Sequence, residues 1–268
     1  MPEKQRGESR PLNPVRDHFY REVAKRLKEV RIPYLVGGAA ALRFYTGVYR
    51  DTKDLDLFCR EADIPRILDL YRDHERYRGD YVDHRWIAKI SHEDYTVDLV
   101  FNSYHGRLPV TESWLEHGRA GDLLGIETSY LGAEELIWTK SYMLHRSRFD
   151  GADINHILLR ASPEIDWRRL LEVMVEDWEL LLAQIVMFRY IYPNESALIP
   201  EFVVEELASR AREWRADSKE KICNGPLISR YPAQYGVDLE KWGYEAPAGS
   251  VDPEDEILDV LDPDTSHG

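Results

Sequence analysis

Three aspartates occupy segments whose other residues are typical of β-strands. Asp54 and Asp56 alternate with leucines, and Asp98 lies between a valine and a leucine. Aspartate is uncommon in strands, so its repeated presence there needs a reason. Residues two apart on a strand project from the same face, about 6.6 Å from each other, and a neighbouring strand can bring a third carboxylate to the same place. Such a group repels itself unless it is protonated or neutralised, and we expect a divalent cation to neutralise it.

All-oxygen ligation of this kind suits Mg²⁺ or Mn²⁺. Two such ions, roughly 3.5–4 Å apart, can activate an attacking hydroxyl and stabilise a leaving phosphate. The aspartates therefore predict a metal-dependent reaction at phosphorus. In isolation, an Asp-x-Asp strand more often marks a solvated sheet edge, and Asp98 by itself can be a strand-end residue that faces solvent. These interpretations stay open at this point.

A glycine pair supplies the second requirement of such a reaction. Gly37 and Gly38 follow the apolar run 32–36 and precede the alanine-rich segment 39–45. This pattern predicts a strand, a glycine turn and a helix. Bare backbone N–H groups at the start of a helix can receive phosphate oxygens without obstruction by side chains. Alone the pair is a weak signal, because strand-to-helix turns often contain glycine for conformational reasons.

The elements that must position these residues follow from the periodicity of apolar residues. Helical spacing predicts an amphipathic helix over 14–30, and alternation predicts strands that carry the aspartates. The turn at 91–94 predicts a hairpin. In chain order we expect strand 32–36, helix 39–45, strand 54–58, helix 64–71, strands 85–91 and 95–101, strand 126–131 and helix 133–146.

From residue 150 onward the pattern is helical. We expect helices over 154–160, 167–175, 180–191 and 202–215. The predicted fold is therefore α+β, with an N-terminal mixed sheet flanked by helices and an α-helical C-terminal region. We predict three domains: a catalytic α/β domain over 1–148, a helical domain over 149–220, and a tail over 221–268 that packs back on the body and ends in a loosely ordered acidic stretch.

The composition excludes some partners. Of the 268 residues 43% are hydrophobic, and 49 acidic against 35 basic residues give a net charge of −14, so we expect no binding to bulk DNA. The two cysteines lie far apart, which fits a reducing compartment. The N-terminal residues are polar, and no apolar segment is long enough to cross a bilayer. We therefore expect a cytoplasmic protein that does not enter the membrane.

Taken together, Gly37-Gly38, the segment 50–56 (Arg-Asp-Thr-Lys-Asp-Leu-Asp) and Asp98 resemble the DNA polymerase β-like nucleotidyltransferase superfamily. The chain looks closest to small bacterial and archaeal branches, which carry a later lysine helix and then an Arg- and Asp-rich turn, here Lys140 and Arg146–Asp153. The resemblance covers about residues 32–158.

The resemblance implies a role for each aspartate. Asp54 and Asp56 would bind two Mg²⁺ or Mn²⁺ ions, and Asp98 would complete the second metal site and assist deprotonation of the acceptor hydroxyl. All three would therefore be both metal ligands and catalytic residues.

The resemblance also implies a nucleotide-binding set. Gly37 and Gly38 would hold the triphosphate of an NTP, and Lys140 would contact its phosphates. Gly38 departs from the family pattern, because many members have serine there and offer a hydroxyl to the phosphate. The segment before the aspartate pair adds three residues to the predicted set: Arg50, Thr52 and Lys53.

The implied activity is transfer of a nucleotidyl group from an NTP to a hydroxyl acceptor, with release of pyrophosphate. The acceptor stays open between a small molecule, RNA and protein, and a partner protein is possible. The alternative is a catalytically inactive nucleotide-binding protein, regulatory or of the toxin–antitoxin type. A haloacid dehalogenase-type phosphohydrolase fits less well, because there the Asp-x-Asp follows an apolar strand, whereas here the polar residues 50–53 precede it.

Overall fold

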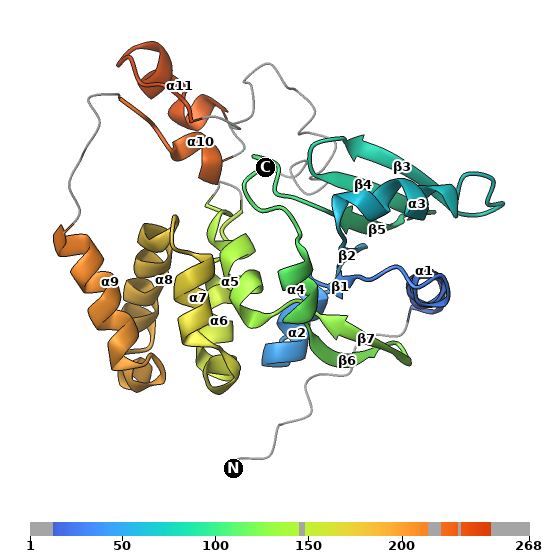
Figure 1. Ribbon diagram of the computed structural model, residues 1–268, viewed down its shortest axis with the longest axis horizontal. Coiled ribbons are helices and arrows are strands. Elements are labelled where there is room, and N and C mark those ends of the chain that lie inside the picture. Colours follow the sequence, from blue (N-terminus) through green and yellow to red (C-terminus); the bar gives the residue numbers. More distant parts are fainter. Residues whose placement is uncertain (1–12, 145–147, 214–220, 230–231, 248–268) are drawn as a thin grey trace. The chain divides into compact units, whose positions relative to one another are not determined.

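The computed structural model describes residues 13–144, 148–213, 221–229 and 232–247 (Figure 1). Two predictions fall outside these residues. They are the start of the Arg- and Asp-rich turn at Arg146 and the loosely ordered acidic stretch at the end of the chain. Backbone contacts divide the chain into two compact units, unit 1 over residues 1–136 and unit 2 over residues 137–268. This division does not test the three domains predicted from the sequence, and their boundaries stay predictions.

Unit 1 contains a seven-stranded mixed sheet in the order β3-β4-β5-β2-β1-β7-β6. Strand β2 runs parallel to β5 and β1 parallel to β7, and the other neighbours are antiparallel. The predicted α+β fold with a mixed sheet is confirmed. The elements are α1 (Pro14–Glu29), β1 (Leu35–Val36), α2 (Gly38–Thr46), β2 (Asp54–Phe58), α3 (Ile64–Asp69), β3 (Arg78–Asp83), β4 (Ile87–His92), β5 (Tyr95–Val100), α4 (Glu112–Glu116), β6 (Arg119–Leu123) and β7 (Ile126–Tyr130).

Helix α1 forms where the sequence predicts an amphipathic helix. The side chain of Asn13 caps it by accepting the N–H of Arg16 at 3.0 Å. Its inner residues Phe19, Val23 and Leu27 are fully buried. Burial of each such side chain stabilises the fold by about 1.5–3 kcal/mol relative to exposure.

The two faces of the sheet are covered differently. The ring of Phe19 in α1 lies 5.5 Å from that of His92 in β4, which places α1 on the face to which His92 belongs. Trp114 of α4 lies 6.1 Å from Phe58 of β2, measured between ring centroids. Because side chains alternate along β2, the aspartates of this strand project from the same face as Phe58. Lys89, which pairs with Asp98, is three positions from His92 on β4, so the two side chains project from opposite faces. The aspartates therefore lie on the face of the sheet that α1 does not cover.

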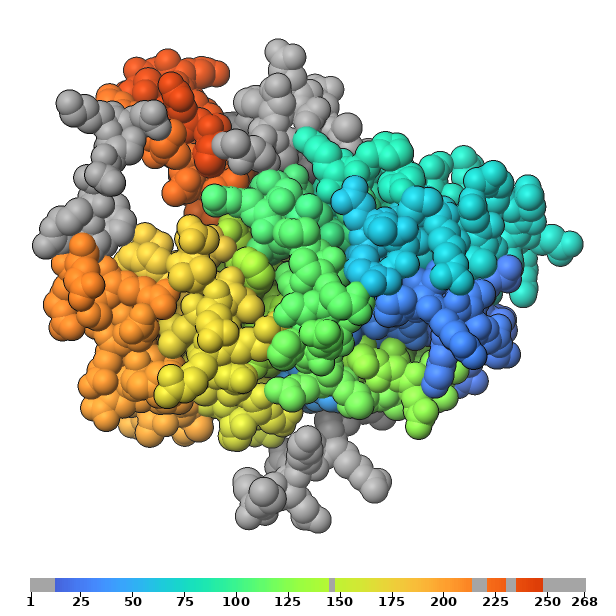
Figure 2. All heavy atoms as spheres, viewed as in Figure 1, coloured from blue at the N-terminus to red at the C-terminus, as the bar shows by residue number. Residues whose placement is uncertain are grey.

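Unit 2 is helical, as predicted for the C-terminal region. Helix α8 contacts α6 and α9, and α9 contacts α7 (Figure 1), and the atoms of these helices form a continuous surface in the space-filling view (Figure 2). The core includes the fully buried Phe188, Val203 and Leu207. Helix α5 (Ala133–Ser141) begins at the end of unit 1, and the helices of unit 2 are α6 (Gly151–Ala161), α7 (Trp167–Val173), α8 (Trp178–Ile191), α9 (Glu201–Glu213), α10 (Gly225–Ile228) and α11 (Pro232–Glu240).

The segment that contains α10 and α11 belongs to unit 2, and it forms backbone hydrogen bonds both with the rest of this unit and within itself. The N–H of Leu144 donates to the carbonyl of Ile228 at 3.1 Å, and Ile222 forms a parallel bridge with Glu245. Within the described ranges, every helix falls short of the combination of length and apolar composition that crossing a bilayer requires.

Candidate active site

The strand register brings the three predicted aspartates to one face of the sheet. Strands β2 and β5 are parallel neighbours, with Asp54 opposite Thr96 and Asp56 opposite Asp98. Residues in register on adjacent strands project from the same face, and Asp54 shares that face because it lies two residues from Asp56. The three carboxylates thus belong to one side of the sheet, although Asp98 is 42 positions after Asp56 in the sequence.

Burial increases from Asp54 to Asp98. Asp54 is exposed, Asp56 is half-buried and Asp98 is 7% exposed. Oδ2 of Asp98 lies 3.2 Å from Nζ of Lys89, whereas its buried Oδ1 has no hydrogen-bond partner among the described residues. Burial raises the pKa of Asp98, the positive charge of Lys89 opposes this rise, and the negative charge of Asp54 adds to it.

Lys89 is a residue of the candidate site that was not predicted from the sequence. It lies on β4 directly opposite Asp98, and its side chain is 21% exposed. The signal that could have indicated it is the presence of one lysine inside the otherwise apolar segment 87–90, the same signal that identified the aspartates. Its ammonium brings one positive charge to the acidic face.

Gly37 and Gly38 are glycines for steric reasons. Gly37 is the N-cap of α2, and its N–H donates to the carbonyl of Asp56 at 2.9 Å. Gly38 has a φ of +52°, and a Cβ at this position would overlap the Asp56 carboxylate. A Cβ at Gly37 would overlap the ring of Phe58. The backbone at the start of α2 therefore lies directly beside Asp56, where a serine side chain at position 38 would have no room.

The segment before the aspartate pair is held by Arg16 of α1. The buried Arg16 donates from Nη1 to Oδ1 of Asp51 at 2.5 Å and to the carbonyl of Thr52 at 3.3 Å. The Thr52 hydroxyl in turn donates to the Asp54 carboxylate. Arg16 thus fixes the segment that orients Asp54, a role for which one sequence offers no signal.

Of the other predicted residues in this segment, Arg50 and Lys53 are exposed, and the carbonyl of Lys53 accepts the N–H of Thr96 at 2.9 Å. The side chains of both residues are placed where solvent reaches them. Their predicted contacts with a nucleotide stay predictions.

Lys140 belongs to unit 2, and its ammonium is already bound. Nζ lies 2.9 Å from Oδ2 of Asp150 and 2.6 Å from Oδ2 of Asp153, and all three side chains are buried. Nε of Arg148 also donates to Asp150 at 3.1 Å. Burial would raise the pKa of Asp150, but the charges of Lys140 and Arg148 outweigh it and lower this pKa to about 2. The predicted contact of Lys140 with phosphate stays a prediction, and it requires these carboxylates to release the ammonium.

Comparison with known families assigns the chain. Residues 17–179 match the model of a family described as nucleotidyl transferase of unknown function (DUF2204). The chain belongs to this family. The matched residues include every predicted site residue, from Gly37 to Lys140, and the superfamily resemblance seen in the sequence is confirmed. Curated protein sequences gave no match.

Solved nucleotidyltransferase structures show a distant likeness to this member of the nucleotidyl transferase family. An antigenic nucleotidyltransferase-like protein from Paracoccidioides brasiliensis is 14% identical, with a TM-score of 0.45 over 70% of this chain and 94% of that chain. The antibiotic-resistance factor ANT(2'')-Ia is 15% identical, with a TM-score of 0.40 over 68% of this chain and 96% of that chain. The lincosamide antibiotic adenylyltransferase LnuA is 15% identical, with a TM-score of 0.40 over 55% of this chain and 96% of that chain. Similarities of this size say nothing about the substrate.

The acidic face of this nucleotidyl transferase has the donor chemistry for a divalent cation but not a closed coordination site. Among the described residues, no three His, Cys, Asp or Glu side chains are grouped closely enough to hold a metal ion. The three carboxylates nevertheless share one face, and the buried Oδ1 of Asp98 lacks a partner there. All-oxygen donors with one buried unsatisfied oxygen fit Mg²⁺ or Mn²⁺, provided that the side chains of Asp54 and Asp56 rotate toward Asp98.

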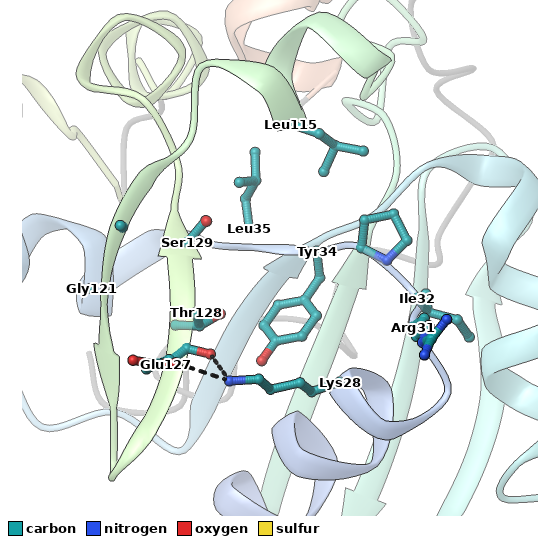
Figure 3. Close-up of a pocket in the computed structure, with 12 residues that line it drawn as sticks. Lys28, Arg31, Ile32, Tyr34, Leu35, Leu115, Gly121, Glu127, Thr128 and Ser129 are labelled. Carbon is teal, nitrogen blue, oxygen red and sulfur yellow. Dashed lines mark hydrogen bonds and ion pairs between the residues drawn. The ribbon is translucent and has the colours of Figure 1, made fainter.

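A separate hollow of about 710 Å³ opens in unit 1 at the start of β1 (Figure 3). It lies where β1 and β7, which pair only at Val36 and Tyr130, diverge from each other. Lys28 reaches across it and donates to the carbonyl of Glu127 at 3.1 Å. The hollow contains none of the predicted site residues, and it lies at the opposite end of β1 from Gly37. It is therefore not the predicted phosphate site.

Proposed function

We propose that this chain transfers a nucleotidyl group from an NTP to a hydroxyl acceptor, with Mg²⁺ or Mn²⁺ as the metal. The observation that carries the proposal is the register of Asp56 with Asp98, which brings three carboxylates to one face of the sheet, next to the bare backbone at Gly37 and Gly38. Metal-bound phosphates need both features, because the cation must be held by anions and the triphosphate by N–H groups.

In this reaction the acceptor oxygen forms a bond to the α-phosphorus as the bond between that phosphorus and the bridging oxygen to the β-phosphate breaks. Pyrophosphate leaves, and the hydroxyl proton passes to Asp98. The bound cation would neutralise charge on the phosphates. Asp54, oriented by Thr52 and Arg16, and Asp56, fixed beside Gly38, would hold it together with Asp98.

Nucleotidyl transfer can be tested with ATP, GTP, CTP and UTP labelled at the α-phosphorus. The full chain is incubated with Mg²⁺ or Mn²⁺ and with RNA, protein or small-molecule fractions as acceptors. We expect label in one fraction with the unchanged chain and none with Asp54→Ala. Asp94→Ala removes an exposed aspartate from the turn between β4 and β5 and is the matched control.

Two results would count against the proposal. Label transfer that survives Asp54→Ala would move the reaction elsewhere in the chain. NTP binding by calorimetry without transfer, for every nucleotide, metal and acceptor fraction, would favour the inactive nucleotide-binding protein instead.

Replacing Lys89 with methionine is expected to tighten Mn²⁺ binding by about tenfold at pH 8. The ammonium lies 3.2 Å from a carboxylate oxygen of Asp98 that a cation would also use. Removing a like charge at this range favours metal binding by about 1–2 kcal/mol. Mn²⁺ titration by calorimetry measures the change. Lys25→Met removes a lysine from the exposed surface of α1 and should leave Mn²⁺ binding unchanged. Weaker binding in Lys89→Met would show instead that Lys89 keeps Asp98 ionised for the metal.

A further inference from the structure

Helix α8 of unit 2 carries apolar residues on its outer side as well as on its inner side. Its inward residues Leu181, Ile185 and Phe188 are buried in the core. On the outward side, Val186 is 57% exposed and Tyr190 is 87% exposed. A helix that is hydrophobic all round is normally covered on every face. Within the described residues, the outer face of α8 has no such cover.

The outer face is a shallow hollow with the ridge pattern of a helix-packing surface. Residues four apart form two rows along it, and rows of this spacing on two helices interdigitate at a crossing angle of about −50°. The small Ala183 lies at the middle of the face, where the axes of two crossing helices approach most closely. The hollow has a volume of about 590 Å³ and is lined by Trp178, Glu179, Leu182, Ala183, Val186, Met187 and Tyr190.

The charges of α8 indicate what covers this face. The helix has two charged residues, Glu179 near its start and Arg189 near its end, each five positions from Gln184. Neither forms an ion pair with another described residue. In an antiparallel pair of α8 helices related by a two-fold axis, each Glu179 lies opposite the Arg189 of the other copy, so two ion pairs form. A parallel pair would place like charges together.

We propose that a second copy of this chain packs against the outer face of α8, with the two helices antiparallel about a two-fold axis. The helix is 14 residues long, which is about 21 Å, and one helix pair buries less area than the roughly 1,200 Å² at which stable interfaces begin. We expect a weak dimer, with a dissociation constant on the order of 1–100 µM, because small interfaces are typical of transient complexes. It does not depend on the reaction proposed for unit 1.

Sedimentation velocity of the full chain from about 1 to 200 µM tests this inference. The unchanged chain is expected to dimerise within that range. Glu179→Arg alone and Arg189→Glu alone each place like charges together and should weaken association by about tenfold or more. The double variant Glu179→Arg/Arg189→Glu should restore association to within about threefold. The two residues are ten positions apart, which is about 15 Å along the helix, so restoration can arise only between two copies.

Val186→Asp places a charge on the exposed apolar surface of this face and should abolish association at every concentration. Because this side chain is mostly exposed, the melting temperature of the dilute protein should not change. Val237→Asp, at a position 44% exposed on α11, is the matched control and should dimerise like the unchanged chain. Two results would overturn the inference: a chain that stays monomeric at 200 µM, or a double variant that does not regain association. The outer face of α8 would then be a binding surface for a protein of different sequence.

Discussion

Replacing Lys140 with methionine is expected to lower the free energy of unfolding by about 3–5 kcal/mol. The substitution leaves Asp150 and Asp153 buried without the ammonium that lies 2.9 and 2.6 Å from their oxygens, and an uncompensated buried charge carries a penalty of this size. Arg148 still contacts Asp150 and limits the loss there. Urea denaturation followed by circular dichroism measures the change, because unit 2 is helical.

Lys28→Met is the matched control for this prediction. Lys28 pairs with Glu127 at 3.6 Å, but both side chains are largely exposed, so the loss should stay within about 1 kcal/mol. If Lys140→Met were as mild as Lys28→Met, the ammonium of Lys140 would not be held between the two aspartates. It would then be free for the phosphate contact that the family resemblance implies.

The same cluster predicts a loss of stability in acid. The pKa of Asp150 falls from 3.8 to about 2 on folding, so the folded chain binds fewer protons than the unfolded chain between these values. The stability that this aspartate contributes, about 2 kcal/mol, is fully present above pH 4 and is lost as the pH falls through 2. Comparing urea midpoints at pH 5 and pH 2.5 should show the loss in the unchanged chain. Asp150→Asn should lack this part of it.

Replacing Gly38 with alanine is expected to lower the free energy of unfolding by about 2–4 kcal/mol and to weaken NTP binding by at least about tenfold. Two effects add together. A non-glycine residue at a φ of +52° costs about 1–2 kcal/mol, and the added Cβ must displace the Asp56 carboxylate. Displacement of Asp56 disturbs both the cation site and the backbone that would hold the triphosphate.

Gly47→Ala separates the two effects. Gly47 also has a positive φ, +77°, but a Cβ there would meet no atom within 4 Å. This variant should therefore show only the conformational cost of about 1–2 kcal/mol and unchanged NTP binding. Urea denaturation and calorimetric NTP titration of both variants provide the comparison. Equal losses in the two variants would mean that Asp56 does not press against the start of α2.

Local periodicity in the sequence was enough to predict the elements in which that periodicity is strong. Alternation along 54–58 and 95–101 predicted both aspartate strands, and the turn at 91–94 predicted the hairpin of β4 and β5. The sequence also identified the nucleotidyl transferase superfamily, since the glycine pair and the Asp-x-Asp are local motifs. Strands β3 and β6 were missed because they lie at the edges of the sheet, where half-exposed polar residues leave no clear alternation. Helix α4 was missed because five residues are too few to show a helical period.

Which residues come into contact with one another depends on tertiary packing. The pairing of β2 with β5, and so the register of Asp56 with Asp98, depends on contacts between segments far apart in the chain, and no local pattern encodes it. The same is true of Lys89 beside Asp98, of Arg16 against Asp51, and of Lys140 between two aspartates. Local spacing determines the direction of a side chain on its own strand or helix. Its charge partners are determined by the packing of the whole chain.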